Sequence, residues 1–165
     1  VVGDKLYIYV SGRDWDRVHG FSASTGLAVL RRDGFASMDA GITPGTFTTR
    51  PVIFKGKYLF VNIDCPEGEL LAEIQNGDGT AIEPFSLAKS VPVKTDSTLC
   101  EVTWRGGKDL SVLAGKPVRI RFRLTHGSLY SFWVSPEKSG ASHGYVGSGG
   151  PGFTGPTDTI GRSGV

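Results

Sequence analysis

The sequence lacks the features by which several large classes of protein are recognised. No run of five or more like charges occurs, and 18 lysines and arginines stand against 16 aspartates and glutamates. Binding to nucleic acid through bulk charge needs a concentrated positive surface, so we expect no nucleic-acid partner. No apolar stretch approaches the about 20 residues of a membrane-spanning helix, so we expect no membrane partner.

Cysteine is scarce, and the start of the chain carries no targeting signal. The two cysteines, Cys65 and Cys100, would form one disulfide or remain as two buried thiols, and the sequence leaves both states open. No basic segment followed by an apolar one stands at the N-terminus, which begins Val1-Val2-Gly3 without methionine. We interpret the chain as a mature product or a piece of a longer protein.

The sequence contains instead many turn residues and short alternating segments. The 24 glycines and 9 prolines in 165 residues disfavour a helical bundle. The clearest alternation covers residues 119–124, where Ile120, Phe122 and Leu124 share one face and three arginines the other. This pattern is typical of a half-buried antiparallel strand. With 39% hydrophobic residues, the sequence predicts one soluble all-β domain, an antiparallel β-sandwich of jelly-roll type.

Turn residues separate the other expected elements. Two hairpins are predicted, the first from residues 58–63 and 70–74 and the second from residues 119–124 and 128–134. Further strands are expected at residues 5–11, 26–31, 46–54 and 99–104, with a turn at 76–79, a single helical turn within 109–116 and Trp104 in the core.

Glycine is concentrated at the end of the chain. Nine of the 24 glycines lie in residues 140–165, a segment without strand pattern that nevertheless holds Tyr145, Phe153 and Ile160. A free linker does not need such apolar anchors, so we expect this tail to wrap the sandwich at least as far as Phe153. Residues 41–139 hold the self-contained strand set, and residues 1–40 resemble the end of another unit joined to it.

Two stretches of the first 40 residues resemble a known family. Residues 3–12 (GDKLYIYVSG) and 26–39 (GLAVLRRDGFASMD) look like the closing strands of a five-bladed β-propeller glycoside hydrolase of the family 32 and 43 type. The C-terminal β-sandwich that follows such propellers is similar to this chain at TTRP (48–51), LFVN (59–62), GGKDLS (106–111), LAGKPV (113–118) and LYSFW (129–133).

The resemblance implies a remnant of the last propeller blade followed by an accessory β-sandwich similar to carbohydrate-binding modules. The catalytic carboxylates of those hydrolases lie in earlier blades, so no catalytic residue is carried over and the chain is not expected to be an enzyme. We expect a non-catalytic, carbohydrate-binding accessory module, extracellular or periplasmic, whose partners are a polysaccharide or oligosaccharide and the parent's catalytic propeller.

Two alternatives remain open. In one, the domain is purely structural and packs on the propeller, in which case an apolar surface around Leu6, Ile8 and Val10 would be left uncovered in the chain alone. In the other, the chain is a fragment of an active glycoside hydrolase.

The segment 12–17 is the first candidate site. Trp15 stands in a polar stretch and would offer an exposed face to a sugar ring, with Asp14 and Asp16 beside it. The same two acids, or the segment 76–79, would be the oxygen ligands if the chain bound Ca²⁺. Neither segment has the spacing of an EF-hand, so the sequence predicts no metal site and no other cofactor. The competing interpretation is a solvated turn, because Arg13 and Arg17 flank the acids.

The last predicted pair of strands supplies the other candidates. Arg121 and Arg123, with Arg119, would grip carboxylate or sulfate groups of an acidic polysaccharide, unless Glu69 and Glu73 on a neighbouring strand neutralise them. Trp133 shares a face with Leu129 and Ser131, whereas Tyr130, Phe132 and Val134 form the larger apolar set and are expected to point inward. Trp133 is then either partly exposed to ligand or buried against the tail.

Overall fold

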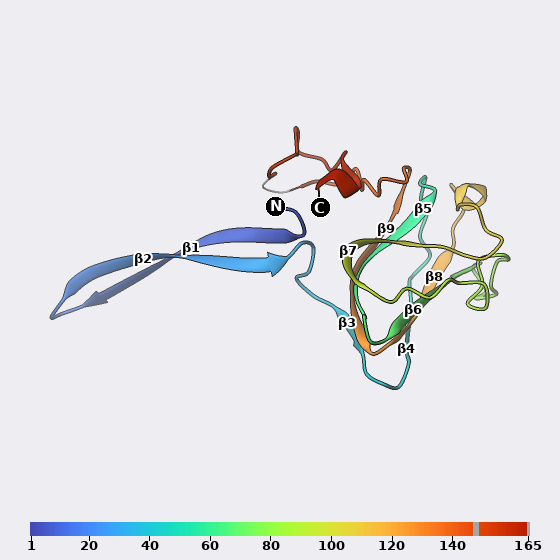
Figure 1. Cartoon of the computed structure of the whole chain (residues 1–165), viewed down its shortest axis with the longest axis horizontal. Coiled ribbons are helices and arrows are strands. Elements are labelled where there is room, and N and C mark those ends of the chain that lie inside the picture. Colours follow the sequence, from blue (N-terminus) through green and yellow to red (C-terminus); the bar gives the residue numbers. More distant parts are fainter. Residues whose placement is uncertain (147–148, 165) are drawn as a thin grey trace.

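The computed structural model describes residues 1–146 and 149–164 and contains a β-sandwich from which one long hairpin projects (Figure 1). Each named strand pairs antiparallel with its neighbours. The predicted all-β, antiparallel sandwich is therefore confirmed, and the jelly-roll connectivity stays a prediction. Among the described residues, no helix is long and apolar enough to cross a membrane.

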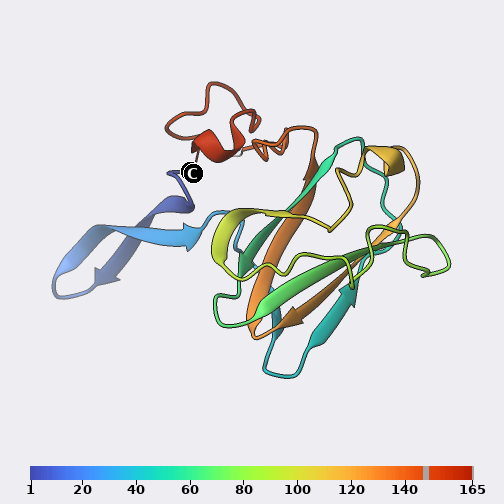
Figure 2. The same cartoon turned by 45° about the vertical axis from the view of Figure 1, so that its right-hand side comes forward.

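Two sheets make the sandwich (Figure 2). The first sheet has the order β3 (Met38–Ala40), β9 (Gly127–Ser135), β5 (Tyr58–Asp64) and β7 (Asp96–Val102). The second has the order β4 (Gly45–Thr48), β8 (Arg119–Thr125) and β6 (Glu69–Gln75). The short strand β3 lies at one edge of the first sheet, and the short strand β4 lies at one edge of the second. The core of the sandwich is formed mainly between the longer strands of the two sheets.

Alternation along the strands builds the core. Ile120 and Phe122 of β8 are buried in the same core cluster as Val61 and Ile63 of β5, as the two-residue period predicts. Trp104 is buried as expected: its indole N–H donates to the Ala72 carbonyl at 2.8 Å. The partner for that N–H removes the penalty of burying a polar group inside an apolar core.

The two predicted hairpins within the sandwich are wrong. β5 and β6 belong to different sheets, and so do β8 and β9. Each pair directs its apolar face toward the same core from opposite sides, so the short connection crosses from one sheet to the other. At the two crossings, Gly68 lies directly on the backbone of Thr125 and His126, and Gly127 lies on Cys65. The two connections thus pack on each other at one end of the sandwich.

The inward set predicted for β9 is also partly wrong. The pairing of β5 with β9 shifts between Asn62 and Ile63, where Ser131 and then Leu129 are the partners, so Tyr130 is skipped in a bulge. Leu129 therefore points into the core on one side of the bulge and Phe132 on the other. Tyr130 instead lies under the Arg31 guanidinium, with 4.8 Å between the guanidinium carbon Cζ and the centre of the Tyr130 ring.

Several expected elements occur with other bounds. The predicted strands at 5–11 and 26–31 extend into β1 (Lys5–Asp16) and β2 (Gly20–Arg31). The strand expected at 46–54 is reduced to β4 with an isolated bridge at Val52, and that at 99–104 is β7. The single helical turn is η1 (Ser111–Leu113), and the turn at 76–79 is closed by a hydrogen bond from the Asn76 N–H to the Thr80 carbonyl at 3.0 Å.

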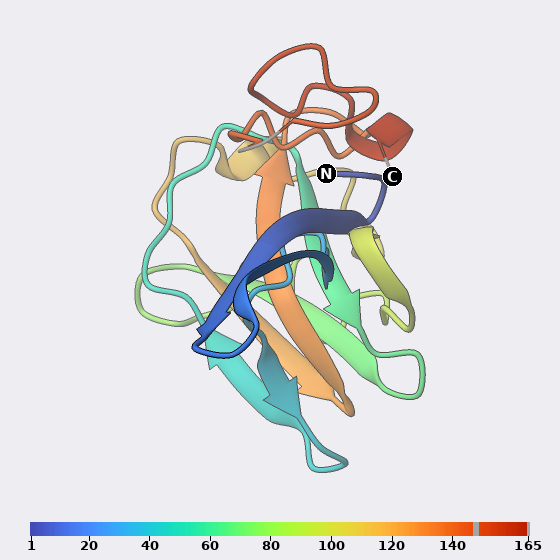
Figure 3. The ribbon, with the colours of Figure 1, turned by 90° about the vertical axis from the view of Figure 1, so that its left-hand side faces the viewer.

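The C-terminal tail lies beyond the end of β9, beside the N-terminus, and ends in η2 (Gly161–Gly164) (Figure 3). Phe60 of β5 is fully buried although it faces away from the sandwich core, because Gly140 and the Arg162 guanidinium cover its ring. Residues 147, 148 and 165 of the tail lie outside the described residues. Tyr145, expected as an anchor, is exposed, and its neighbour Val146 is buried in its place.

Both cysteines are free thiols. Burial raises the pKa of both thiols, with the carboxylate of Asp64 adding to the effect at Cys65. Cys65 is buried, and Cys100 is half-buried. Since the thiolate is the reactive form, we predict that iodoacetamide at pH 8 labels Cys100 slowly and Cys65 only on unfolding. Mass spectrometry of peptides after timed labelling measures the order, and labelling of Cys65 before Cys100 would contradict it.

Candidate functional site

The β1–β2 hairpin is the most unusual surface of the molecule. Its strands pair over their full length, from Lys5 with Arg31 to Asp16 with Gly20, and no other named strand joins them. In an antiparallel pair, partners share a face, so Tyr9 and Leu27 lie on one face, and Ile8 lies on the other. The exposed large apolar side chains between residues 7 and 29 are Tyr7, Ile8, Tyr9, Val10, Trp15, Val18, Phe21, Leu27 and Val29.

The hairpin tip holds the first sequence-predicted residues. Asp14, Trp15 and Asp16 belong to β1 and not to a loop, because the pairing continues to Gly20. Successive strand residues point to opposite faces, so both acids lie on the face opposite Trp15 and do not flank one sugar platform. Trp15 is 66% exposed, as expected, and its partner across the pair is Phe21, also exposed.

Asp16 is used by the hairpin turn. Its carboxylate accepts the N–H of Val18 and of His19, both at 2.6 Å, and its second oxygen is 3.0 Å from the His19 ring nitrogen Nδ1. The hydrogen bond from the His19 backbone, followed by those from its side chain and from Val18, lowers the pKa of Asp16. These contacts make Asp16 a turn-stabilising residue.

The other calcium candidate is likewise explained by its turn. The side chains of Asn76 and Asp78 both accept the Thr80 N–H, at 2.9 and 2.8 Å. Hydrogen bonds from Thr80, the side chain first, lower the pKa of Asp78. In the part of the chain that the structure describes, no group of three or more His, Cys, Asp or Glu side chains is arranged to hold a metal ion.

The arginine row lies on the outer face of the second sheet. Arg121 stands opposite Glu73, with 4.0 Å between guanidinium nitrogen Nη1 and carboxylate oxygen Oε1. Glu69 does not reach the row, because it pairs with Lys94 at 3.5 Å. Arg123 is exposed beside Leu71 and Thr46 of the flanking strands. The carboxylate of Glu73 thus meets one cation of the row, as the solvated-face interpretation expects.

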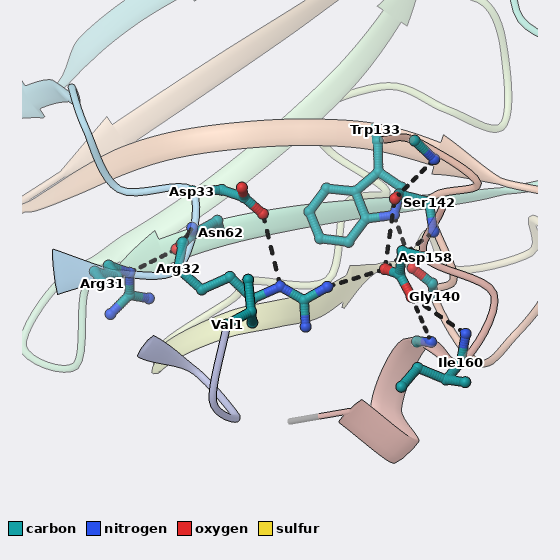
Figure 4. Close-up of polar contacts among 12 residues, drawn as sticks. Val1, Arg31, Arg32, Asp33, Asn62, Trp133, Gly140, Ser142, Asp158 and Ile160 are labelled. Atoms are coloured by element: carbon teal, nitrogen blue, oxygen red, sulfur yellow. Dashed lines mark hydrogen bonds and ion pairs between the residues drawn. The ribbon is translucent and has the colours of Figure 1, made fainter. Parts of the chain in front are cut away.

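Trp133 lies beneath the tail. Its ring stacks on Phe60 with 5.7 Å between ring centres. Its indole N–H donates to the Gly140 carbonyl at 2.9 Å (Figure 4). Of the two possibilities left open by the sequence, burial against the tail accounts for these contacts. A ring whose face and polar atom are both engaged is poorly available to ligand.

The root of the hairpin is fixed by two consecutive arginines. Arg31 donates to the Asn62 side chain at 2.6 Å and to the Ile63 carbonyl at 2.9 Å, both on β5. The Arg32 side chain points away from β5 toward the tail and donates to the buried Asp158 carboxylate at 3.0 Å (Figure 4). The sandwich and the tail therefore hold the hairpin from two sides.

Asp158 gathers the tail around this ion pair. One carboxylate oxygen accepts from Arg32 and, at 3.4 Å, from both the N–H and the hydroxyl of Ser142. The other accepts the N–H of Ile160 and of Gly161, at 3.2 and 3.0 Å. A buried carboxylate is stable only with such complete pairing.

A cleft opens between the hairpin root and the tail. It has a volume of about 620 Å³ and is lined by aromatic rings, including Tyr9 and Tyr145, and by the side chains of Arg32, Asp33 and Ser142. Arg32 is 8% exposed, and its nitrogen Nη1 has no hydrogen-bond partner among the described residues. This cleft was not predicted from the sequence.

The six sequence-predicted site residues lie in three separate places. Asp14, Trp15 and Asp16 are at the hairpin tip, Arg121 and Arg123 are on the second sheet, and Trp133 is under the tail. They do not converge on one site. The sequence signal that could have indicated the cleft, and was not used, is the pair Tyr7 and Tyr9, whose spacing of two puts both rings on one face of β1.

Comparison with known proteins adds no assignment: no protein-family model, no curated protein and no solved structure matches the chain.

Proposed function

We propose that the chain is a non-catalytic accessory domain that docks through its β1–β2 hairpin on the β-propeller of a glycoside hydrolase. The observation that carries the proposal is the isolated hairpin, whose exposed apolar side chains occupy both faces. The resemblance of residues 3–12 and 26–39 to the closing strands of such a propeller names the partner. An extracellular or periplasmic location belongs to the same proposal.

Physical chemistry supports a missing partner. An isolated two-stranded hairpin is marginally stable in water, and strands of 12 residues expose a long row of unpaired backbone groups at each edge. Soluble monomers rarely expose large contiguous apolar surfaces. Both liabilities disappear if the hairpin is added to the sheet of a propeller blade. Of the three residues named for the packing role, Ile8 and Val10 are exposed, whereas Leu6 is half-buried.

A second candidate function is carbohydrate binding, and a specific observation favours it. Tyr7, Tyr9, Trp15 and Phe21 are exposed on one face of the hairpin. Aromatic faces with polar groups alongside are the usual surface for sugar rings. The arginine row gives weaker support for an acidic polysaccharide, because Glu73 faces Arg121.

Hydrogen exchange tests the docking proposal. In the chain alone, we predict that the outward-facing amides of β1 and β2 exchange within seconds, whereas core amides of β5 and β8 are protected. Joined to the propeller domain of its parent reading frame, the hairpin should gain at least about a hundredfold protection, with β5 and β8 unchanged as the internal control. A parent without propeller blades, or a joined hairpin that exchanges as fast as before, would sink the proposal.

A further inference from the structure

The cleft between the hairpin root and the tail has the form of a ligand site. Its volume of about 620 Å³ falls within the range of about 300–1,000 Å³ typical of small-molecule sites. We propose that it binds a short, uncharged oligosaccharide. The inference rests on the carbohydrate-binding candidate above and names the site and the ligand class; it does not depend on the docking of the hairpin.

Aromatic rings supply the first part of the argument. Tyr9, Phe35 and Tyr145 line the cleft and are 76%, 70% and 77% exposed. They come from the hairpin, from the segment after it and from the tail, so three separate segments contribute an aromatic residue to one cleft. Pyranose C–H groups pack on such faces, and exposed tyrosine hydroxyls remain free to bond sugar hydroxyls.

Polar groups supply the second part. The Arg32 side chain lines the cleft and is nine-tenths buried, and its nitrogen Nη1 is itself buried and lacks an acceptor among the described residues, so the cleft wall holds one unsatisfied donor. Asp33 and Ser142 line the same cleft and offer an acceptor and a hydroxyl. Sugar hydroxyls, which donate and accept, match this mixed set.

The balance of charge favours an uncharged sugar. The charged groups that line the cleft are two cations, Arg32 and the Val1 ammonium, and two anions, Asp33 and Asp158. Arg32 is paired with Asp158, and the Val1 ammonium donates to the Gly149 carbonyl at 2.7 Å. A uronate or sulfate would gain no excess of positive charge there, which distinguishes this site from the arginine row.

The cleft also suits a ligand better than the other candidates. The hairpin tip offers Trp15 and Phe21 but separates them from the acids, which lie on the opposite face. Trp133 is covered by the tail. Only the cleft, among the described candidates, combines several exposed rings with hydrogen-bonding groups in one hollow.

Affinity electrophoresis and calorimetry of the whole chain test the inference. The probes are neutral polysaccharides and oligosaccharides (glucans, xylans, mannans and galactans) and, separately, uronate polymers. We expect a neutral glycan to bind, with affinity reduced at least about tenfold in Tyr9→Ala and in Tyr145→Ala. Ile53→Ala, which shortens an exposed apolar side chain outside the hairpin and the tail, is the control and should bind as the unchanged chain does. Trp15→Ala tests the hairpin tip as an alternative site. Both tyrosines are exposed, so folding should survive, and circular dichroism of each variant verifies it.

The outcomes separate the two levels of the claim. Absence of binding to every glycan would overturn carbohydrate binding as a whole. Binding that persists in both tyrosine variants, or is lost in Trp15→Ala, would leave carbohydrate binding standing and overturn the cleft. Retention only on uronate polymers, lost in Arg121→Ala and in salt, would move the site to the arginine row. Tyrosine variants that weaken docking on the propeller but not glycan binding would make the cleft a protein contact.

Discussion

Replacing Gly68 by alanine should abolish folding or cost about 3 kcal/mol or more. A Cβ atom at this position would lie 1.8 Å from the Thr125 carbonyl oxygen and 2.3 Å from that of His126. Both atoms are backbone and belong to the crossing between β8 and β9, so no side-chain rotation relieves the clash. The crossing between β5 and β6 would have to separate from it, which opens one end of the core.

Gly77 is the matched control. It also lies in a turn, but nothing stands within 4 Å of its Cβ position and its φ is not in the left-handed region. Gly77→Ala should therefore change the free energy of unfolding by less than about 1 kcal/mol. Urea denaturation followed by tryptophan fluorescence measures both variants. Equal stability of Gly68→Ala and Gly77→Ala would show that the two crossings do not pack as described.

Replacing Asp158 by alanine should release the tail. The substitution leaves the buried Arg32 guanidinium without its counter-charge and removes the acceptor of four further hydrogen bonds, two from Ser142 and one each from Ile160 and Gly161. Removing one partner of a buried pair costs about 3–5 kcal/mol. If the tail detaches in the variant, the loss of stability equals the free energy with which the tail packs on the sandwich. That free energy is therefore the largest loss that the substitution can cause.

Detachment has its own measurement. Lys138 precedes the tail and Arg162 lies near its end, and trypsin should cut at both sites faster in Asp158→Ala, with a lowered Tm for the variant. Asp33→Asn is the control, because Asp33 is exposed, stands 3.8 Å from the same guanidinium and has a φ of 53°, a conformation that asparagine tolerates as aspartate does. An exposed ion pair of this kind contributes little, so its variant should keep the tail resistant. Equal digestion of the two variants would argue against the Asp158 cluster.

Alternation predicts which side chains face the core, but not which strands are neighbours. The faces of Ile120, Phe122 and Leu124 follow from a period of two, and the structure confirms them. The turn residues after β5 and β8 indicate only that the chain reverses direction. A connection between two sheets uses the same turn residues as a hairpin within one sheet, so the sequence does not distinguish them. The bulge that moves Tyr130 out of the inward set comes from the register against β5, which no local pattern records.

Site residues divide in the same way. Exposure of Trp15 follows from its polar neighbours, whereas its separation from Asp14 and Asp16 follows from a strand that is longer than the alternation suggests. The cleft is made by Tyr9, Arg32 and Tyr145, which are brought together only when the tail folds back to the hairpin root. No spacing motif connects residues so far apart in the chain.

The ion pair at the hairpin root also governs where the tip can reach. A strand of 12 residues at about 3.3 Å each is a lever about 40 Å long. A rotation of the hairpin by about 5° about its root would therefore displace Trp15 by about 3 Å, close to the length of a hydrogen bond. The position of the tip thus depends on how rigidly the contacts around Arg31, Arg32 and Asp158 hold the root, and a substitution at the root would displace the distant tip.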